Sequence, residues 1–263
     1  LESAGTVLSA SAEGGTYGNL SYNATNTGEI EITGCDMGVT SVEIPAEIDG
    51  KRVTSIGDDA FRDCTSLTEL TIPDSVTSID RLAFYGCTSL TSITIPDSVT
   101  SIGYSAFCGC TSLTEIMIPD SVTKIGDGAF CYCTNLTEIT IPDSVTSIGE
   151  NAFRICTNLA AITILNGVTS IRKYAFSGCT SLTEITIPDS VTEIGDGAFY
   201  DCTNLTIYGY TGSYAETYAK KNDIPFVSLN NITTTETTTT TIETTVTTKA
   251  TTTTETVTTE ATS

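Results

Sequence analysis

The chain has 263 residues, with 32 acidic against 11 basic side chains, so its net charge is −21 and its pI lies near 4.1. This balance argues against binding to nucleic acid or to an anionic membrane, because both need clustered basic side chains. The sequence also lacks histidine, the commonest general base and metal ligand, as well as G-x-S-x-G and P-loop motifs, so we expect no catalytic residue, metal or cofactor.

The first fifty residues precede the regular part of the sequence. Residues 1–14 are small and polar, and we expect them to be flexible. Residues 15–50 are predicted to form an N-terminal cap, in which the alternating stretches 20–22 and 29–33 flank turn residues and indicate a hairpin. The chain starts at Leu1 without Met, so we expect a fragment or a mature form of a longer protein.

Residues 51–206 contain one motif that recurs at a fixed period. The stretch CTSLTELTIPDSVTSID starts at Cys64 and returns with small changes, and the copy at Cys156 is the loosest. The first residues of the copies are 23 positions apart, at Cys64, Cys87, Cys110, Cys133, Cys156, Cys179 and Cys202. A fixed period of this length is typical of a solenoid.

Each repeat unit has one apolar side. Leu67-x-x-Leu70-x-Ile72 predicts a short strand that ends near Pro73. Ala83, Phe84 and Cys87 have the spacing of one face of a helical turn. Stacked parallel strands lie about 4.8 Å apart, so the equivalent phenylalanines and cysteines of all units should form two columns in a shared core. The phenylalanines are Phe61, Phe84, Phe107, Phe130, Phe153, Phe176 and Phe199.

The repeated block L-T-E-I-T-I-P-D-S-V-T-S-I-G-x-x-A-F-x-x-C resembles the BspA-like leucine-rich repeats of bacterial surface proteins, over about residues 30–228. The resemblance implies a leucine-rich-repeat solenoid of stacked short parallel strands, with short helical turns on the convex side. It also implies a surface or secreted protein that binds other macromolecules. We therefore favour a non-catalytic protein-binding or adhesion module of an exported bacterial protein. Its partner would be a protein or cell-surface ligand, and we expect a monomer. The alternative is a rigid spacer in a multimodular protein whose activity lies in another module.

The pattern changes after the last repeat. Residues 207–229 are predicted to be a C-terminal cap with a short helix, because Ser213 and Glu216 form a capping box and Pro225 follows the helix. Tyr214, Tyr218 and Ala219 should share one face of this helix. Residues 230–263 contain 20 threonines and are expected to be a linker beyond the folded domain. No apolar run reaches the length of about 18 residues that a membrane span needs.

The concave strand surface is the predicted binding face, because solenoids use such extended surfaces for partners. The outward side chains of its strands form two columns. One contains Glu69, Ser92, Glu115, Glu138, Ala161 and Glu184, and the other contains Thr71, Thr94, Met117, Thr140, Thr163 and Thr186. The alternative is a solvated face of good β-formers that contacts nothing specific.

Two cysteines outside the regular column predict a disulfide. Cys108 and Cys131 are one repeat apart, so their Cα atoms should lie about 5 Å apart on successive coils, within the range that a disulfide spans. Their column otherwise holds polar or amphipathic residues, which indicates that it faces outward: Arg62, Tyr85, Arg154, Ser177 and Tyr200. The alternative is a pair of free surface thiols. Cys35 belongs to neither column.

Overall fold

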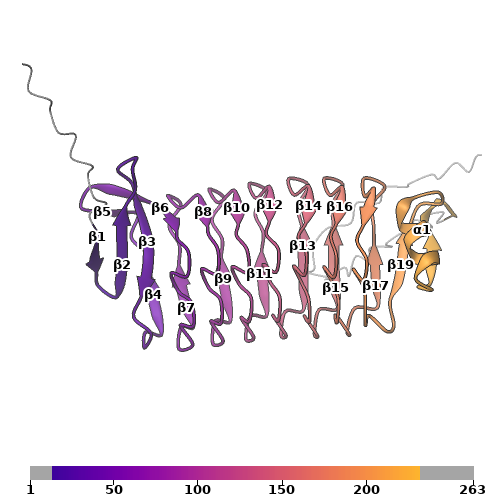
Figure 1. Ribbon diagram of the computed structural model, residues 1–263, viewed down its shortest axis with the longest axis horizontal. Coiled ribbons are helices and arrows are strands. Elements are labelled where there is room, and N and C mark those ends of the chain that lie inside the picture. The colour runs from indigo at the N-terminus through magenta and orange to yellow at the C-terminus, as the bar shows by residue number, and fades with distance from the viewer. Residues whose placement is uncertain (1–13, 232–263) are drawn as a thin grey trace, which may run out of the picture. The chain divides into compact units, whose positions relative to one another are not determined.

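The computed structural model describes residues 14–231. The expectations for the flexible N-terminal segment and the Thr-rich linker therefore lie almost wholly outside the described residues. The described chain forms a solenoid whose coils stack side by side along one axis, as Figure 1 shows. Each regular coil contributes one strand to each of two walls and closes through a third, turn-rich side.

The first wall consists of the predicted strands. It contains β4 (Ser41–Glu43), β7 (Glu69–Thr71), β9 (Ser92–Thr94), β11 (Glu115–Met117), β13 (Glu138–Ile141), β15 (Ala161–Ile164), β17 (Glu184–Thr186) and β19 (Thr206–Gly209). Hydrogen-bonded neighbours in this wall are parallel, and between regular repeats their register equals the repeat length, as in Ile116 opposite Ile93. The wall thus brings equivalent residues of successive repeats next to each other.

The second wall was not predicted as strands. It contains β6 (Lys51–Ile56), β8 (Ser78–Ile79), β10 (Ser101–Ile102), β12 (Lys124–Ile125), β14 (Ser147–Ile148), β16 (Ser170–Ile171) and β18 (Glu193–Ile194). These strands also pair in parallel, one coil to the next. From β8 onward each is only two residues long, too short to show the alternation by which a strand is recognised in sequence.

The third side holds turns where the sequence predicted helical turns. Ala83 and Cys87 point into the core as expected, but Leu82 has a left-handed φ of 56°, which a helix would not contain. Alternate N–H groups donate to the next coil at 2.7–2.9 Å: Leu82, Phe84 and Gly86 reach the carbonyls of Tyr104, Ala106 and Cys108. In a helix these groups would bond within their own coil. Here they join one coil to another.

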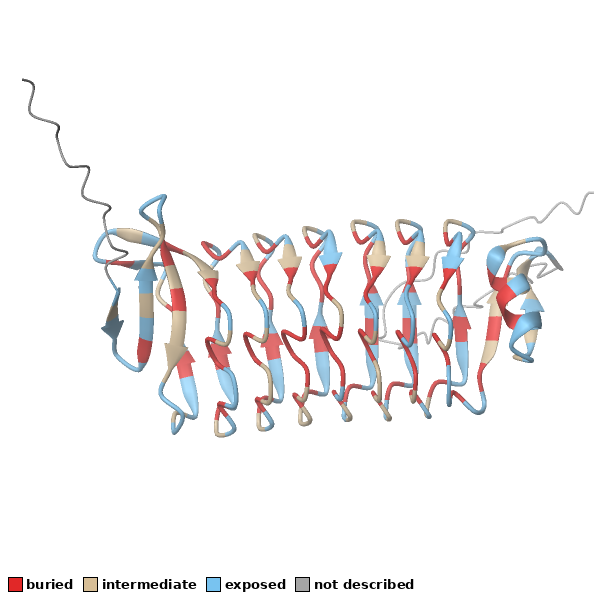
Figure 2. Cartoon of the chain, in the orientation of Figure 1, coloured by how far each residue is buried: buried red, intermediate tan, exposed pale blue. Residues whose placement is uncertain are grey.

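The core contains the predicted phenylalanine column. Successive rings from Phe61 to Phe199 stack with centroids 5.1–5.4 Å apart and interplanar angles of 2–16°. Every ring is buried, and Figure 2 shows the alternation of buried and exposed positions repeating from coil to coil. The prediction that these side chains form one stacked core is confirmed.

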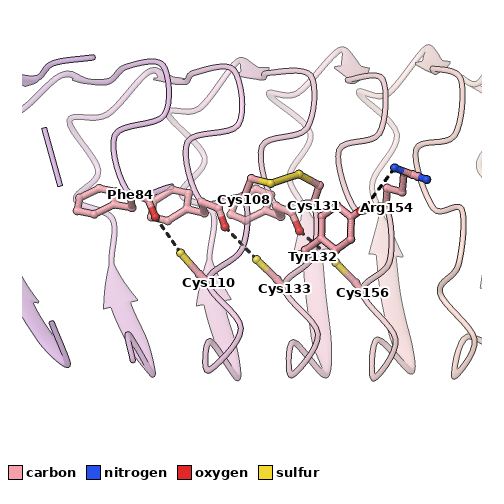
Figure 3. The surroundings of a disulfide bond; sticks show 10 residues. Phe84, Cys108, Cys110, Cys131, Tyr132, Cys133, Arg154 and Cys156 are labelled. Atoms are coloured by element: carbon pink, nitrogen blue, oxygen red, sulfur yellow. Dashed lines mark hydrogen bonds between the residues drawn. A yellow bond between two sulfur atoms is a disulfide. The ribbon is translucent and has the colours of Figure 1, made fainter. Parts of the chain in front are cut away.

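The cysteine column is also buried, and its thiols have a bonding role. Cys87 donates its S–H to the carbonyl of Phe61 at 3.0 Å, and five later cysteines repeat this contact at 3.2 Å with the phenylalanine of the preceding coil. Figure 3 shows the contacts of Cys110, Cys133 and Cys156. Burial raises the pKa of Cys110 and of Cys156 to about 12, so both stay protonated and can donate at neutral pH. Cysteine suits the position because it is a small apolar side chain that still carries a donor.

The polar residues that recur at fixed positions of the repeat also join the coils through hydrogen bonds. The N–H and the hydroxyl of Thr100 both donate to the carbonyl of Thr77, and Thr123 does the same to Thr100. Hydroxyls of Ser98, Ser121, Ser144 and Ser190 each donate to a valine carbonyl of the preceding coil at 2.5–2.7 Å. The motif therefore encodes an inter-coil hydrogen-bond network as well as an apolar core.

The N-terminal end is covered by β1 (Gly14–Tyr17), β2 (Leu20–Ala24) and β3 (Ile30–Cys35), with the short strand β5 (Glu47–Ile48) paired to β6. The predicted hairpin is β2 with β3, in which Tyr22 lies opposite Ile32. Strand β3 pairs in parallel with β6 and so extends the second wall.

The C-terminal end is covered by α1 (Tyr214–Lys221), β20 (Phe226–Ser228) and the 3₁₀ turn Leu229–Asn231. Half of the predicted capping box is present, because the Ser213 hydroxyl accepts from the Glu216 N–H. The Glu216 carboxylate accepts from the N–H of Gly212, the residue before the N-cap, instead of from that of Ser213. Tyr218, Ala219 and Ala215 form the buried face of the helix, whereas Tyr214 is exposed.

The serine contacts give a matched pair of mutations. Ser121→Ala removes the donor to the Val99 carbonyl and is expected to cost about 1 kcal/mol. Ser75→Ala should be neutral or stabilising, because among the described residues the buried Ser75 hydroxyl has no hydrogen-bond partner. Urea denaturation of the two variants measures the difference, and equal losses would contradict it.

Candidate binding surfaces

The outward side chains of the first wall form a continuous surface, which we call the Glu/Thr face. All its predicted members are exposed and project from β7 to β17: Glu69, Thr71, Ser92, Thr94, Glu115, Met117, Glu138, Thr140, Thr163, Glu184 and Thr186. The pairing of the strands brings equivalent members side by side, such as Glu115 with Ser92 and Met117 with Thr94. The surface is acidic, with glutamate as its recurring charged side chain.

The Glu/Thr face has a single large apolar side chain near its middle. Met117 is 80 % exposed, the highest value among the exposed large apolar side chains of residues 14–231. It lies beside Thr94 and on the same strand as Glu115. A flexible thioether surrounded by carboxylates and hydroxyls can contact an apolar group of a partner while the carboxylates pair with its basic side chains.

The same face extends further than the sequence analysis predicted. Strand β4 adds Ser41 and Glu43 at one end, and β19 adds Tyr208 at the other, opposite Thr186. The Tyr208 hydroxyl lies 3.4 Å from a Glu184 carboxylate oxygen. The available signal was Leu205-Thr206-Ile207-Tyr208, which continues the strand pattern of the repeat with a one-residue shorter spacing.

The second wall carries an open groove of about 650 Å³ that sequence reasoning missed. Gly103, Gly126 and Gly149 line it at equivalent positions of three coils, and Asp80 and Arg172 occupy the same position in the flanking coils. A Cβ atom at any of these three glycines would approach the backbone of the preceding coil to 2.5–2.7 Å. With the present backbone, a side chain at these three positions would force the preceding coil to shift, whereas the flanking coils accommodate Asp80 and Arg172.

The groove is balanced in charge although the protein is strongly acidic. Its charged lining is Asp58, Asp80, Asp127, Arg81, Lys124 and Arg172. Arg81 lies 3.8 Å from an Asp58 oxygen, and Arg172 lies 3.7 Å from Asp127. Burial raises the pKa of Asp80, and the charge of Asp58 raises it further.

The turn side carries the exposed aromatic residues of the solenoid. Tyr104, Tyr132, Tyr174 and Tyr200 are all exposed and occupy positions of the repeat that vary from unit to unit. The guanidinium of Arg62 lies 5.3 Å from the ring centroid of Tyr85, and Arg154 lies 5.9 Å from that of Tyr132. Such contacts order both partners on the surface.

Between these two Arg–Tyr pairs, Cys108 and Cys131 form a disulfide, with Cα atoms 4.6 Å apart (Figure 3). The expectation that both would be outward and accessible is wrong, because they are only 7 % and 8 % exposed. In this column the short side chains are buried and the long ones are partly or fully exposed. Ser177 is buried as well, whereas the longer Arg62 and Tyr200 are exposed.

Residues 14–231 contain no group of three or more histidine, cysteine, aspartate or glutamate side chains placed to hold a metal ion. In the same part of the chain, no helix has the length and apolarity needed to cross a membrane.

Comparison with known proteins gives the same architecture. The family profile described as the BspA-type leucine-rich repeat region, in six copies, matches residues 34–160 and 123–251. The chain belongs to this family. No curated protein sequence matches it.

Among solved structures, a leucine-rich cell surface protein of Faecalibacterium prausnitzii is 39 % identical with a TM-score of 0.70, over 76 % of this chain and 55 % of that one. A leucine-rich-repeat protein of Bacteroides ovatus is 34 % identical with a TM-score of 0.69, over 75 % and 56 % of the two chains. The leucine-rich-repeat protein of T. pallidum, at 24 % identity and a TM-score of 0.56 over 82 % and 98 %, shares the fold. The chain thus spans little more than half the length of the first two.

Proposed function

We propose that this chain is a non-catalytic protein-binding module of an exported bacterial surface protein, and that the Glu/Thr face makes the contact. The observation that carries the proposal is the exposure of Met117 in the middle of an otherwise polar, acidic strand face. Methionine is enriched in protein interfaces, and a rim of charged residues is typical around their apolar centres. The partner would then present an apolar group framed by lysine or arginine.

Two observations support export to the cell surface. The F. prausnitzii relative is described as a cell surface protein. The disulfide between Cys108 and Cys131 also fits an oxidising compartment, because cytosolic thiols are kept reduced. Adhesion to a host protein or to another cell would be the physiological form of such binding.

The test is a charge reversal on the Glu/Thr face. The double variant Glu115→Lys/Glu138→Lys is expected to lose binding to a basic partner, because like charges now face each other, while its circular dichroism spectrum stays unchanged. The wild type is first screened on an array of purified extracellular-matrix proteins, mucins and glycans, and each hit is then measured with the variants.

The matched control is Glu150→Lys/Glu193→Lys, which makes the same change of charge at exposed positions outside the Glu/Thr face. Binding should survive in this control. Loss in both double variants would mean that total charge alone drives binding, and unchanged affinity in the first would move the site to the groove or to the turn side. Met117→Ala tests the apolar centre and should weaken binding without changing net charge.

The second candidate function is a rigid spacer that displays another module. The observation that favours it is the series of inter-coil hydrogen bonds that runs through the regular coils between two capped ends. In this case the wild-type array would show no partner.

A further inference from the structure

The groove on the second wall lies outside the Glu/Thr face and has no role in the binding proposed above. Its floor consists of β10, β12 and β14, which lie side by side in Figure 1, together with Gly103, Gly126 and Gly149. Each of these strands is already paired with another strand on both sides. The floor therefore offers no free strand edge to which an extended peptide could add, and a ligand must bind through side chains.

Lys124 supplies an unpaired positive charge in the middle coil of this groove. It is exposed, and it makes no ion pair within residues 14–231. The other two cations of the groove, Arg81 and Arg172, lie near Asp58 and Asp127. An anionic group of a ligand would complement the charge of Lys124. The equivalent residues of the neighbouring coils are all serine: Ser78, Ser101, Ser147 and Ser170.

Tyr104 supplies an aromatic surface in the same groove. It is 55 % exposed, and it lines the groove beside Gly103. A tyrosine ring is a flat apolar surface with a polar tip. The C–H face of a pyranose ring packs on such a surface and leaves the sugar hydroxyls free for polar neighbours. The equivalent residues of the other coils are all charged: Asp58, Arg81, Asp127, Glu150, Lys173 and Asp196.

The remaining lining is suited to hydroxyl groups. The side-chain hydroxyls of Ser101 and Thr146 make no hydrogen bond within residues 14–231, so each can donate to a ligand or accept from it. Asp80 adds a carboxylate at one end of the groove, and Arg172 adds a guanidinium at the other. These two residues are four repeats apart, so at about 4.8 Å per coil the groove is about 19 Å long. This length suits a chain of several sugar units better than a monosaccharide.

We propose that this groove binds a linear acidic oligosaccharide. Lys124 pairs with a sugar carboxylate, Tyr104 packs against the face of an adjacent ring, and Ser101 and Thr146 bond to sugar hydroxyls. An acidic peptide would meet the same charge, but the groove has no open apolar pocket for an anchoring side chain, because its isoleucines are buried. The groove and the Glu/Thr face share no residue, so either proposal can fail without the other.

The test is calorimetric titration of the full chain with three linear acidic tetrasaccharides: tetragalacturonate, tetramannuronate and a hyaluronan tetrasaccharide. We expect at least one of them to bind with a Kd below about 1 mM. Lys124→Ser, which introduces the serine of the neighbouring coils, should weaken that binding at least about tenfold, the effect of losing a charge-assisted hydrogen bond.

Two further comparisons separate the charge from the ring contact. Methyl esterification of the sugar carboxylates should weaken binding to the wild type by a similar factor, and it should leave binding to Lys124→Ser nearly unchanged, because the charge pair is already lost there. Tyr104→Ala should weaken binding of both the acid and its ester, because packing against the ring does not depend on the carboxylate.

The matched control is Lys173→Ser, which removes the same charge from an exposed lysine that does not line the groove. Binding should be unchanged in this control. A hexaglutamate peptide tests the rival class of ligand, and it should bind the wild type more weakly than the sugar does. Three results would each overturn the proposal: no binding of any of the three tetrasaccharides, equal losses in Lys124→Ser and Lys173→Ser, or a peptide that binds as tightly as the sugar.

Discussion

Phe130→Ala is expected to lower the free energy of unfolding by about 3–5 kcal/mol, the range for truncating a buried aromatic side chain. The Phe130 ring is fully buried between Phe107 and Phe153, at centroid distances of 5.4 and 5.3 Å. Removing it opens a cavity and ends two ring contacts in the middle of the column. Because each coil contacts only its neighbours, this also weakens the coupling between the two halves of the array.

The matched control is Phe199→Ala at the C-terminal end. Phe199 stacks on Phe176 on one side only, and on the other it meets the edge of Tyr218 at 5.9 Å and 72°. The loss of unfolding free energy in Phe199→Ala should be smaller, because the last coil and its cap can fray without separating the rest of the solenoid. Urea denaturation followed by circular dichroism compares the two variants. Equal losses would argue against nearest-neighbour stacking.

Removing the Cys108–Cys131 disulfide is expected to cost about 3 kcal/mol, by the loop entropy of a 23-residue closure. The double variant Cys108→Ala/Cys131→Ala is made in a Cys35→Ser background, which removes the half-buried free thiol of Cys35. Its unfolding midpoint in urea should fall below that of the oxidised background protein. A reducing agent should lower the urea midpoint of the background protein to that of the double variant, and it should leave the midpoint of the double variant unchanged.

The state of this bond must be measured after denaturation without reductant. Cys108 and Cys131 are buried, as are the free thiols of the column, so native alkylation would miss free thiols as well as bonded ones. Peptide mapping should recover Cys108 joined to Cys131. Equal urea midpoints for the oxidised background protein and the double variant would refute the stabilising role.

The sequence alone determined the features that depend on the repeat length. Residues one period apart occupy equivalent positions on neighbouring coils, so the repeat length alone predicts the stacked column from Phe61 to Phe199. The sequence likewise predicts the outward position of Glu115 and Met117 and the close approach of Cys108 to Cys131. In a solenoid each coil packs on its neighbour in the same way, so a contact between residues one period apart recurs along the array.

The tertiary structure decided what depends on the path of the backbone between those columns. Strands such as Ser78–Ile79 exist because neighbouring coils pair with them, and the turns near Leu82 are held by bonds to the next coil instead of by a helical pattern. The groove depends on how the backbones of neighbouring coils pack, and the covering of the first coil by β3 depends on a cap outside the repeat. The period shows which residues lie side by side on neighbouring coils, but it does not show the path of the backbone between them, and it does not extend to the cap.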